Sequence, residues 1–122
     1  MSKAEAIFEE MASVVGQMGG ELKSKFTGIV KFDITKVGNW TLDLKSEGDP
    51  TVTKDAKGKK PDLVIKVNDD DFALLYDGKL NAQQAFMKGK LKVKGNMGLA
   101  MKFEKVLNAT RKNIEKSKKA RL

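Results

Sequence analysis

Four lysines alternate with other residues just before an apolar, methionine-rich segment. They are Lys88, Lys90, Lys92 and Lys94, and Lys102 follows within the apolar segment. Ammonium groups at this spacing project from one side of an extended strand, where they can attract the phosphates of a ligand or a membrane. The pattern also fits an edge strand whose outward lysines block pairing with another sheet. The two interpretations are compatible, and the spacing alone favours neither.

The excess positive charge lies in the last third of the 122-residue chain, whose net charge is +8. Residues 88–122 hold 12 of the 24 Lys and Arg and two of the 16 acids, a net charge of +10, whereas residues 1–87 carry −2. A basic region of this kind suits a nucleic acid, an anionic membrane or an acidic ligand head group. A basic adaptor that binds nucleic acid or anionic surfaces through this third is the alternative function. Nucleic-acid binding is not expected, because the aromatic residues lie on the apolar sides of the predicted strands and helices and not beside the lysines. The chain also contains no RNA-recognition or zinc-binding signature.

Residues that commonly carry catalysis are scarce. The chain has no His and no Cys, which removes the commonest general base, the commonest metal ligand and thiolate chemistry. Gly89, Gly95 and Gly98 match neither of the glycine-rich phosphate-binding patterns. The acidic residues lie on the solvent-facing sides of the predicted strands and helices or at helix caps. We therefore expect no catalysis by this chain, no metal and no cofactor.

The spacing of apolar residues predicts one α+β domain over residues 1–122. Ser2 and Glu5 form a capping box for an amphipathic helix that Gly19-Gly20 should end. Period-two alternation predicts strands over 26–34, 40–45, 51–53, 63–67 and around Leu91 and Val93. Short helices are expected from 69 and from 82, the second burying Phe86, and a last helical region after 96. Together these elements predict a five-stranded, mainly antiparallel sheet covered on one face by about five helices.

Several methionines and phenylalanines lie at core spacing: Met11, Met18, Met87, Met97 and Met101, with Phe72, Phe86 and Phe103. A packed core is the default interpretation. Methionine side chains also re-pack easily, so the second interpretation is a cavity that accepts flexible lipids. The acids in the first eleven residues argue against a signal peptide, no segment is apolar enough to span a membrane, and Cys is absent, so a soluble intracellular protein is expected.

The stretch from residue 69 onward resembles the sterol carrier protein type 2 domain, and the resemblance spans nearly the whole chain. Its most specific part is the run from Gly89 to Lys102, GKLKVKGNMGLAMK. Further matching positions are Asp71-Phe72, Leu75, Gly78-Lys79, Asn81, Gln84 and Ala85-Phe86, with Trp40 and Leu42 to Lys45 upstream. The tail after Leu107 is longer and more basic than the family pattern.

The resemblance implies a hydrophobic tunnel between sheet and helices for fatty acids, fatty acyl-coenzyme A, sterols or phospholipids. It implies a carrier that supports peroxisomal lipid metabolism and is sometimes fused to a β-oxidation enzyme. This chain is expected to be a free-standing, monomeric and non-catalytic carrier. The residues expected to line the tunnel are Phe32, Trp40, Leu42, Phe72, Leu75, Phe86, Met87, Leu99, Met101, Phe103, Val106 and Leu107. The residues expected to face an anionic head group or to make transient contact with an anionic membrane are Lys88, Lys90, Lys92, Lys94 and Lys102.

The C-terminal residues Ala120, Arg121 and Leu122 have the form small-basic-leucine, like the peroxisomal signal whose type is Ser-Lys-Leu. Residues 115–122 are too polar to pack, so a flexible tail that presents this signal to a peroxisomal import receptor is expected. The predicted location is peroxisomal, with a cytoplasmic pool also compatible with the sequence.

Overall fold

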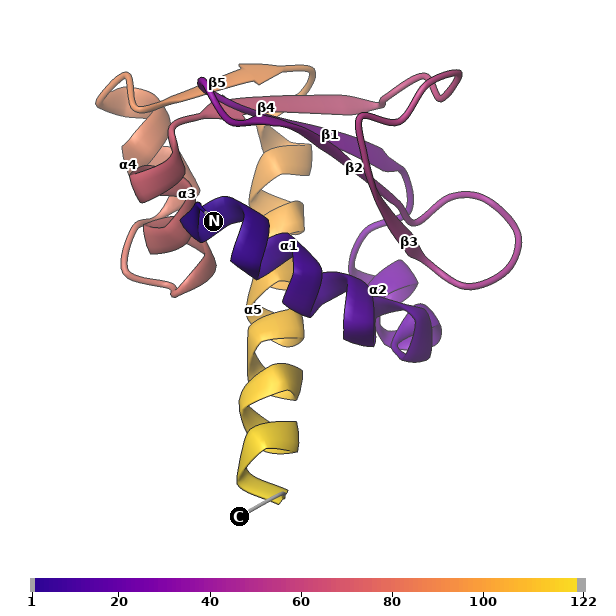
Figure 1. The fold of residues 1–122 in the computed structure, drawn as a ribbon. Helices are drawn as coiled ribbons and strands as arrows, with labels where there is room; N and C mark the ends of the chain where they lie inside the picture. The colour runs from indigo at the N-terminus through magenta and orange to yellow at the C-terminus, as the bar shows by residue number, and fades with distance from the viewer. Residues whose placement is uncertain (1, 121–122) are drawn as a thin grey trace.

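A five-stranded sheet forms one layer of the molecule, and helices cover one of its faces (Figure 1). This computed structural model describes the backbone of residues 2–120 and the side chains of residues 2–116. The strands lie in the order β3-β2-β1-β4-β5. Their bounds are β1 Ile29–Ile34, β2 Gly38–Asp43, β3 Thr51–Lys54, β4 Leu63–Val67 and β5 Leu91–Lys94. The predicted fold class, a mainly antiparallel sheet with helices on one face, is confirmed.

One strand pair is parallel: β1 and β4 run in the same direction, with Phe32 opposite Ile65. The pairs β1–β2, β2–β3 and β4–β5 are antiparallel. The β1–β2 turn takes Lys36 into the left-handed region at φ +63°, and Gly38 follows it at φ +150°. At the far edge of the sheet, β5 pairs only with β4 among the described strands, so the predicted edge strand is confirmed.

Alternation along each strand decides which side chains enter the core. The inward positions of β1, β2 and β4 are buried: Val30, Phe32, Ile34, Trp40, Leu42, Leu63, Ile65 and Val67. The outward position Asp43 is also buried, and its carboxylate binds the Lys59 ammonium at 2.8 Å. That carboxylate also accepts the backbone N–H groups of Lys45 and Ser46. This network fixes the loop that leaves β2.

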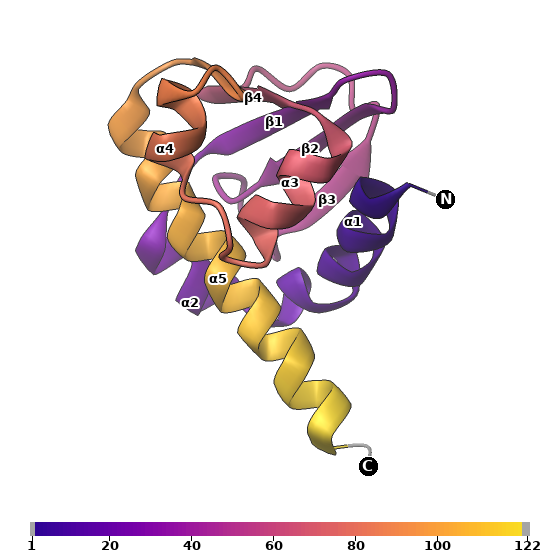
Figure 2. The same ribbon diagram turned by 90° about the vertical axis from the view of Figure 1, so that its left-hand side faces the viewer.

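The helices are α1 Lys3–Val14, α2 Gly19–Lys25, α3 Asp69–Tyr76, α4 Ala82–Met87 and α5 Met97–Ala120. Side chains cap three of them: the Ser2 hydroxyl accepts the N–H of Glu5, Asn68 accepts that of Asp71, and Asn81 accepts that of Gln83. The cap of α3 is therefore Asn68, and the aspartates expected to supply it form the first turn instead. In Figure 2 the long α5 passes beneath the sheet, with α3 and α4 on one side of it and α2 on the other.

An aromatic cluster joins α1, α3 and α5 to the sheet. The Phe8 ring stacks on Trp40 with centroids 4.7 Å apart and on Phe72 at 4.8 Å, and its centroid lies 5.3 Å from that of Phe32. Phe32 also contacts Phe103 of α5 at 5.1 Å. Because Phe8 is 1% exposed, one side chain of α1 fixes this helix against both the sheet and α3.

The bounds of several elements differ from the sequence predictions. The strands expected over 26–34 and 40–45 are Ile29–Ile34 and Gly38–Asp43, and the first helix, expected to end at Gly19-Gly20, ends at Val14. Gly19-Gly20 begin α2, a helix that the alternation pattern did not predict, because the buried Leu22 of α2 and Phe26 just after it anchor that segment. At the C-terminus, α5 includes residues 115–120, and lysine and alanine are good helix formers. The flexible tail over 115–122 stays a prediction. Of the proposed targeting signal, Arg121 and Leu122 lie outside the described residues, and Ala120 is described only as the last residue of α5.

Candidate functional site

The candidate ligand site is an apolar junction between the sheet and helices α3, α4 and α5. It holds a cavity of about 20 Å³. The cavity is lined by Phe32, Ile65, Phe72, Leu75, Ala82, Leu91, Ala100, Phe103, Glu104 and Leu107. This volume is far smaller than that of an acyl chain, so no lipid-sized space lies open at this junction. The resemblance implied an open tunnel, and among the described residues this junction is closed instead.

Five of the predicted lining residues meet at this cavity: Phe32, Phe72, Leu75, Phe103 and Leu107. They come from β1, α3 and α5, which are far apart in the sequence. Three other predicted residues are buried elsewhere in the core. These are Leu42, Val106 and Trp40. The Trp40 ring stacks on Phe8, and the Lys54 ammonium lies 5.4 Å from its centroid.

Three of the four remaining predicted lining residues are exposed to solvent, and the fourth is partly buried against the core. Phe86, Met87 and Met101 are 46%, 76% and 47% exposed, and Leu99 is half-buried. The expectation that Phe86 is buried in α4 is therefore wrong. The reason is the shortness of α4: Ala82 and Ala85 occupy its inner face, and Phe86 and Met87 fall at its end on the outer side.

Five cavity residues were not predicted as site residues. The strand phase places Ile65 and Leu91 inward, and this signal was available in the sequence. Ala82 and Ala100 are small residues that leave room at the cavity, and no sequence pattern indicated that they would line it. Glu104 supplies a carboxylate at the cavity wall, and this carboxylate accepts the backbone N–H of Ala82 at 2.5 Å. It therefore ties the start of α4 to α5.

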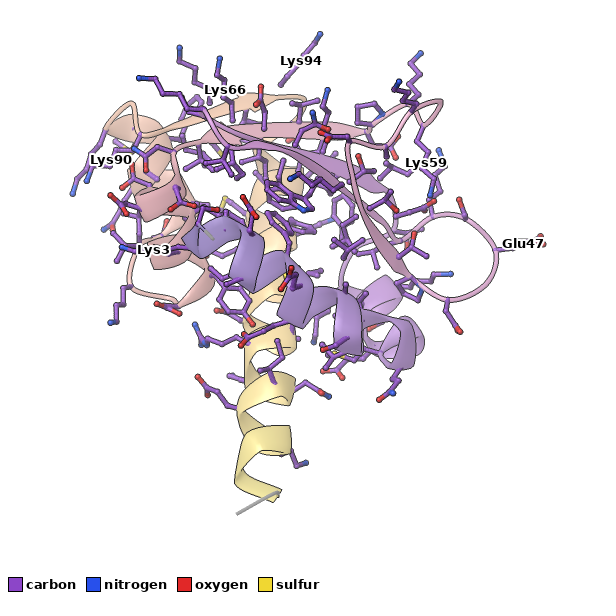
Figure 3. The ribbon with its side chains drawn as sticks, viewed as in Figure 1. Lys3, Glu47, Lys59, Lys66, Lys90 and Lys94 are labelled. Carbon is purple, nitrogen blue, oxygen red and sulfur yellow. The ribbon has the colours of Figure 1, made fainter. Side chains whose placement is uncertain are left out.

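The predicted lysine strip divides into separate groups. Lys92 and Lys94 project from the helix-free face of the sheet, where Lys92 lies opposite Lys66 of β4. Figure 3 shows Lys66 and Lys94 pointing away from the helices, while Lys90 lies at the side of the molecule next to α4. Lys88 ends α4, and Lys102 is exposed on α5. The alternation of lysines therefore predicts the direction of the side chains within β5 but not that of the lysines before and after this strand.

A surface hollow of about 540 Å³ collects part of this charge. Lys66, Lys90 and Lys92 line it, together with Asn68 and the carboxylate-bearing Asp71. Three ammonium groups facing one carboxylate give the hollow a net positive charge. It can attract an anionic head group, as was predicted for Lys90 and Lys92.

A second basic groove, of about 460 Å³, lies between α2 and α5. Its lysines are Lys25, Lys105, Lys112 and Lys116, and its one acid is Glu21. No sequence pattern indicated this groove, because Lys25 lies 80 residues or more before the other three lysines. They meet only when α5 packs against α2.

The titratable groups with shifted pKa values are not poised for proton transfer at neutral pH. Burial alone would raise the pKa of Asp43, but its bonds to Lys59 and Ser46 outweigh this, and the pKa lies well below its usual range. Burial raises the pKa of the Tyr76 hydroxyl, and the Glu10 carboxylate adds to the effect. The Asp70 carboxylate raises the pKa of Lys3. All three shifts lead away from pH 7, so these groups keep one charge state there.

The described residues contain neither a cluster of metal-binding side chains nor a membrane-spanning helix. Within them, no group of three or more His, Cys, Asp or Glu residues gathers to hold a metal ion. None of their helices combines the length and the apolar character needed to cross a membrane.

Comparison with known proteins identifies the family. Residues 15–108 match the model of the SCP-2 sterol transfer family. The chain is 42% identical over 111 residues to peroxisomal multifunctional enzyme A of Dictyostelium discoideum, covering 88% of this chain and 25% of that protein. It is 40% identical over 107 residues to sterol carrier protein 2 of Rattus norvegicus, covering 84% of this chain and 19% of that protein. The chain therefore spans a quarter or less of the length of these relatives.

Solved structures agree with this assignment. The sterol carrier protein domain 2 of Helicoverpa armigera superimposes with a TM-score of 0.67 at 36% identity, covering 85% of this chain and 87% of that one. The shared fold, the matched span and the sequence identity lead to one conclusion: this chain belongs to the SCP-2 sterol transfer family.

Proposed function

We propose that this chain is a non-catalytic lipid carrier that binds the apolar part of its ligand between the sheet and helices α3, α4 and α5. One observation carries the proposal. The junction of these elements is walled by apolar side chains, with Glu104 as the one charged residue among the described residues that line it. Membership of a sterol transfer family supports the same assignment.

Lipid has to displace the packed side chains, since the cavity of about 20 Å³ is smaller than an acyl chain. The energetics allow this. Burying about 14 methylenes at ~0.8 kcal/mol each gives ~11 kcal/mol before costs. Ordering the chain, losing its free translation and moving the helices consume much of this sum, which leaves an expected dissociation constant in the micromolar range or somewhat below.

The first test is whether lipid stabilises the protein. A ligand that binds only the folded state at a hundred times its dissociation constant adds about 2.7 kcal/mol of stability. For a domain of this size, that corresponds to a rise in Tm of about 10 °C. We expect this rise with a fatty acid, a fatty acyl-coenzyme A or a sterol, measured by differential scanning calorimetry.

Native mass spectrometry of the purified protein identifies which of these lipids it carries. Soluble coenzyme A without an acyl chain serves as the control and should leave Tm nearly unchanged. If none of these lipids, nor a phospholipid, changes Tm or appears in the mass spectrum, the carrier function is wrong.

We further propose that the carrier works in peroxisomes, with Ala120, Arg121 and Leu122 as the import signal. The relative called peroxisomal multifunctional enzyme A supports this location, as does the small-basic-leucine form of the tripeptide. A cytosolic fluorescent reporter fused to residues 113–122 should concentrate in peroxisomes, and deletion of Leu122 should leave it diffuse. A diffuse reporter with the intact tail, in cells that import a Ser-Lys-Leu control, would contradict the location but not the carrier function.

A further inference from the structure

Three large apolar side chains are exposed at one end of the molecule. Phe86 and Met87 lie at the end of α4, and Met101 lies near the start of α5. Their exposed fractions are 46%, 76% and 47%, and only one other large apolar residue among the described residues, Leu74, is similarly exposed. Apolar residues gathered at a surface mark a site of interaction more often than single ones do.

The fold brings Phe86 and Met101 to the same level of the molecule. Figures 1 and 2 show α4 running toward the sheet and α5 running away from it. The start of α4 is fixed to α5 by the bond from the Ala82 N–H to Glu104. Phe86 lies one turn further along α4, and Met101 lies about one turn before Glu104 on α5. The two exposed side chains therefore belong to neighbouring turns of α4 and α5.

Positive charge surrounds this surface. Residues 78–103 contain six lysines and neither Asp nor Glu. Lys88 follows Met87 directly, Lys102 follows Met101, and Lys90 lies beside α4 (Figure 3). An apolar centre with a cationic rim is complementary to an anionic bilayer, whose acyl region takes up the apolar side chains while its phosphates attract the lysines. A nonpolar protein partner would not require the lysines.

We propose that Phe86, Met87 and Met101, with Lys88, Lys90 and Lys102, form a docking surface for anionic lipid bilayers. The same α4, α5 and β5 also cover the candidate lipid site, since Ala82, Leu91 and Ala100 line its cavity. Docking therefore places the bilayer against the helices between which lipid must pass. This role in lipid transfer rests on the proposed carrier function, whereas the docking itself does not.

Helix α4 is suited to move when the surface docks. It has six residues, and its buried members are the small Ala82 and Ala85. Displacing it exposes little apolar area, and the bilayer takes up the side chains at its end. Movement of α4 away from α5 opens a path from the cavity to the docked membrane.

The first experiment uses the absence of cysteine from the chain. A single environment-sensitive fluorophore is attached to Met87→Cys, and in a control protein to Glu47→Cys, which lies on the loop at the opposite end of the molecule (Figure 3). Vesicles of phosphatidylcholine with phosphatidylserine should shift the emission of the first label to the blue and leave the second unchanged. Vesicles of phosphatidylcholine alone should give a much weaker shift.

Three results would overturn the docking proposal. One is equal shifts of both labels, and another is no shift of the Met87→Cys label. The third is a shift that appears on raising the protein concentration without vesicles, which would assign the surface to self-association.

The second experiment separates docking from lipid binding. The double variant Phe86→Ser/Met87→Ser should bind anionic vesicles about tenfold or more weakly in a sedimentation assay, since two side chains no longer insert. Its affinity for a fatty acid in solution and its Tm should stay close to those of the starting protein, because both residues are exposed. Transfer of the fatty acid to anionic vesicles should slow by a similar factor. Leu74→Ser is the matched control, and it should change none of these quantities.

The outcomes distinguish the two proposals. Unchanged vesicle binding by the double variant overturns the docking surface and leaves the carrier function intact. Weakened vesicle binding in a protein that binds no lipid in solution supports docking and contradicts the carrier function.

Discussion

Replacing Ala100 with tryptophan is expected to weaken the binding of a fatty acid by about a hundredfold. Ala100 is 2% exposed and lines the cavity between the sheet and α5. An indole at this position occupies the space that the acyl chain has to enter. If it excludes about four methylenes from the interior, the loss is about 3 kcal/mol, or roughly a hundredfold in affinity. The measurement is displacement of a fluorescent fatty acid, followed by the emission of that fatty acid.

Two further variants make this result interpretable. Ala6→Trp places the same side chain at an exposed position of α1 and should bind normally. Ala82→Leu narrows the cavity from α4 with a smaller side chain and should weaken binding by about tenfold. Ala82→Leu replaces Ala100→Trp as the test if the tryptophan variant does not fold. Normal affinity in folded Ala100→Trp and Ala82→Leu would move the lipid site away from this junction.

Replacing Phe8 with alanine is expected to remove about 4 kcal/mol from the free energy of unfolding, out of a typical total of about 5–15 kcal/mol. Its ring contacts Trp40, Phe72 and Phe32 within 5.3 Å between centroids and is almost fully buried. Truncation leaves a cavity where α1, α3 and the sheet meet, and these elements cannot close it without moving. The measurement is urea denaturation followed by circular dichroism.

The matched control changes the same residue type at the surface. Phe86→Ala should alter the free energy of unfolding by no more than about 0.5 kcal/mol, because this ring is half-exposed at the end of α4. Equal losses for the two variants would contradict the assignment of Phe8 to the core and Phe86 to the surface.

Local patterns in the sequence determined most of the elements and the faces that they bury. Strand alternation alone placed Val30, Phe32, Ile34, Trp40 and Leu42 inside, and the structure confirms their burial. Side-chain caps placed the starts of α1 and α4, and glycine marked the ends of several elements. These features were predictable because a residue's phase in a strand, or its position at a helix end, depends on neighbours a few residues away.

Features that depend on distant parts of the chain were decided only by the tertiary structure. No pattern indicated that β4 pairs with β1 in parallel, because strand pairing depends on which edges are left free once the hairpins have formed. The packing of α5 against α4 determined that Ala82, Ala100 and Glu104 line the candidate site. The same packing determined that Phe86, Met87 and Met101 do not line it.

The lysine alternation illustrates both cases. It correctly placed Lys92 and Lys94 on one side of an edge strand, since alternation is a local property of extended backbone. It did not reveal that Lys66 of the neighbouring strand joins Lys90 and Lys92 in one hollow, or that Lys88 belongs to the end of α4. The sequence determined which residues carry charge and which are apolar. Only the packing of helices on the sheet decided which of them meet, because side chains far apart in the chain come together only when the core excludes water.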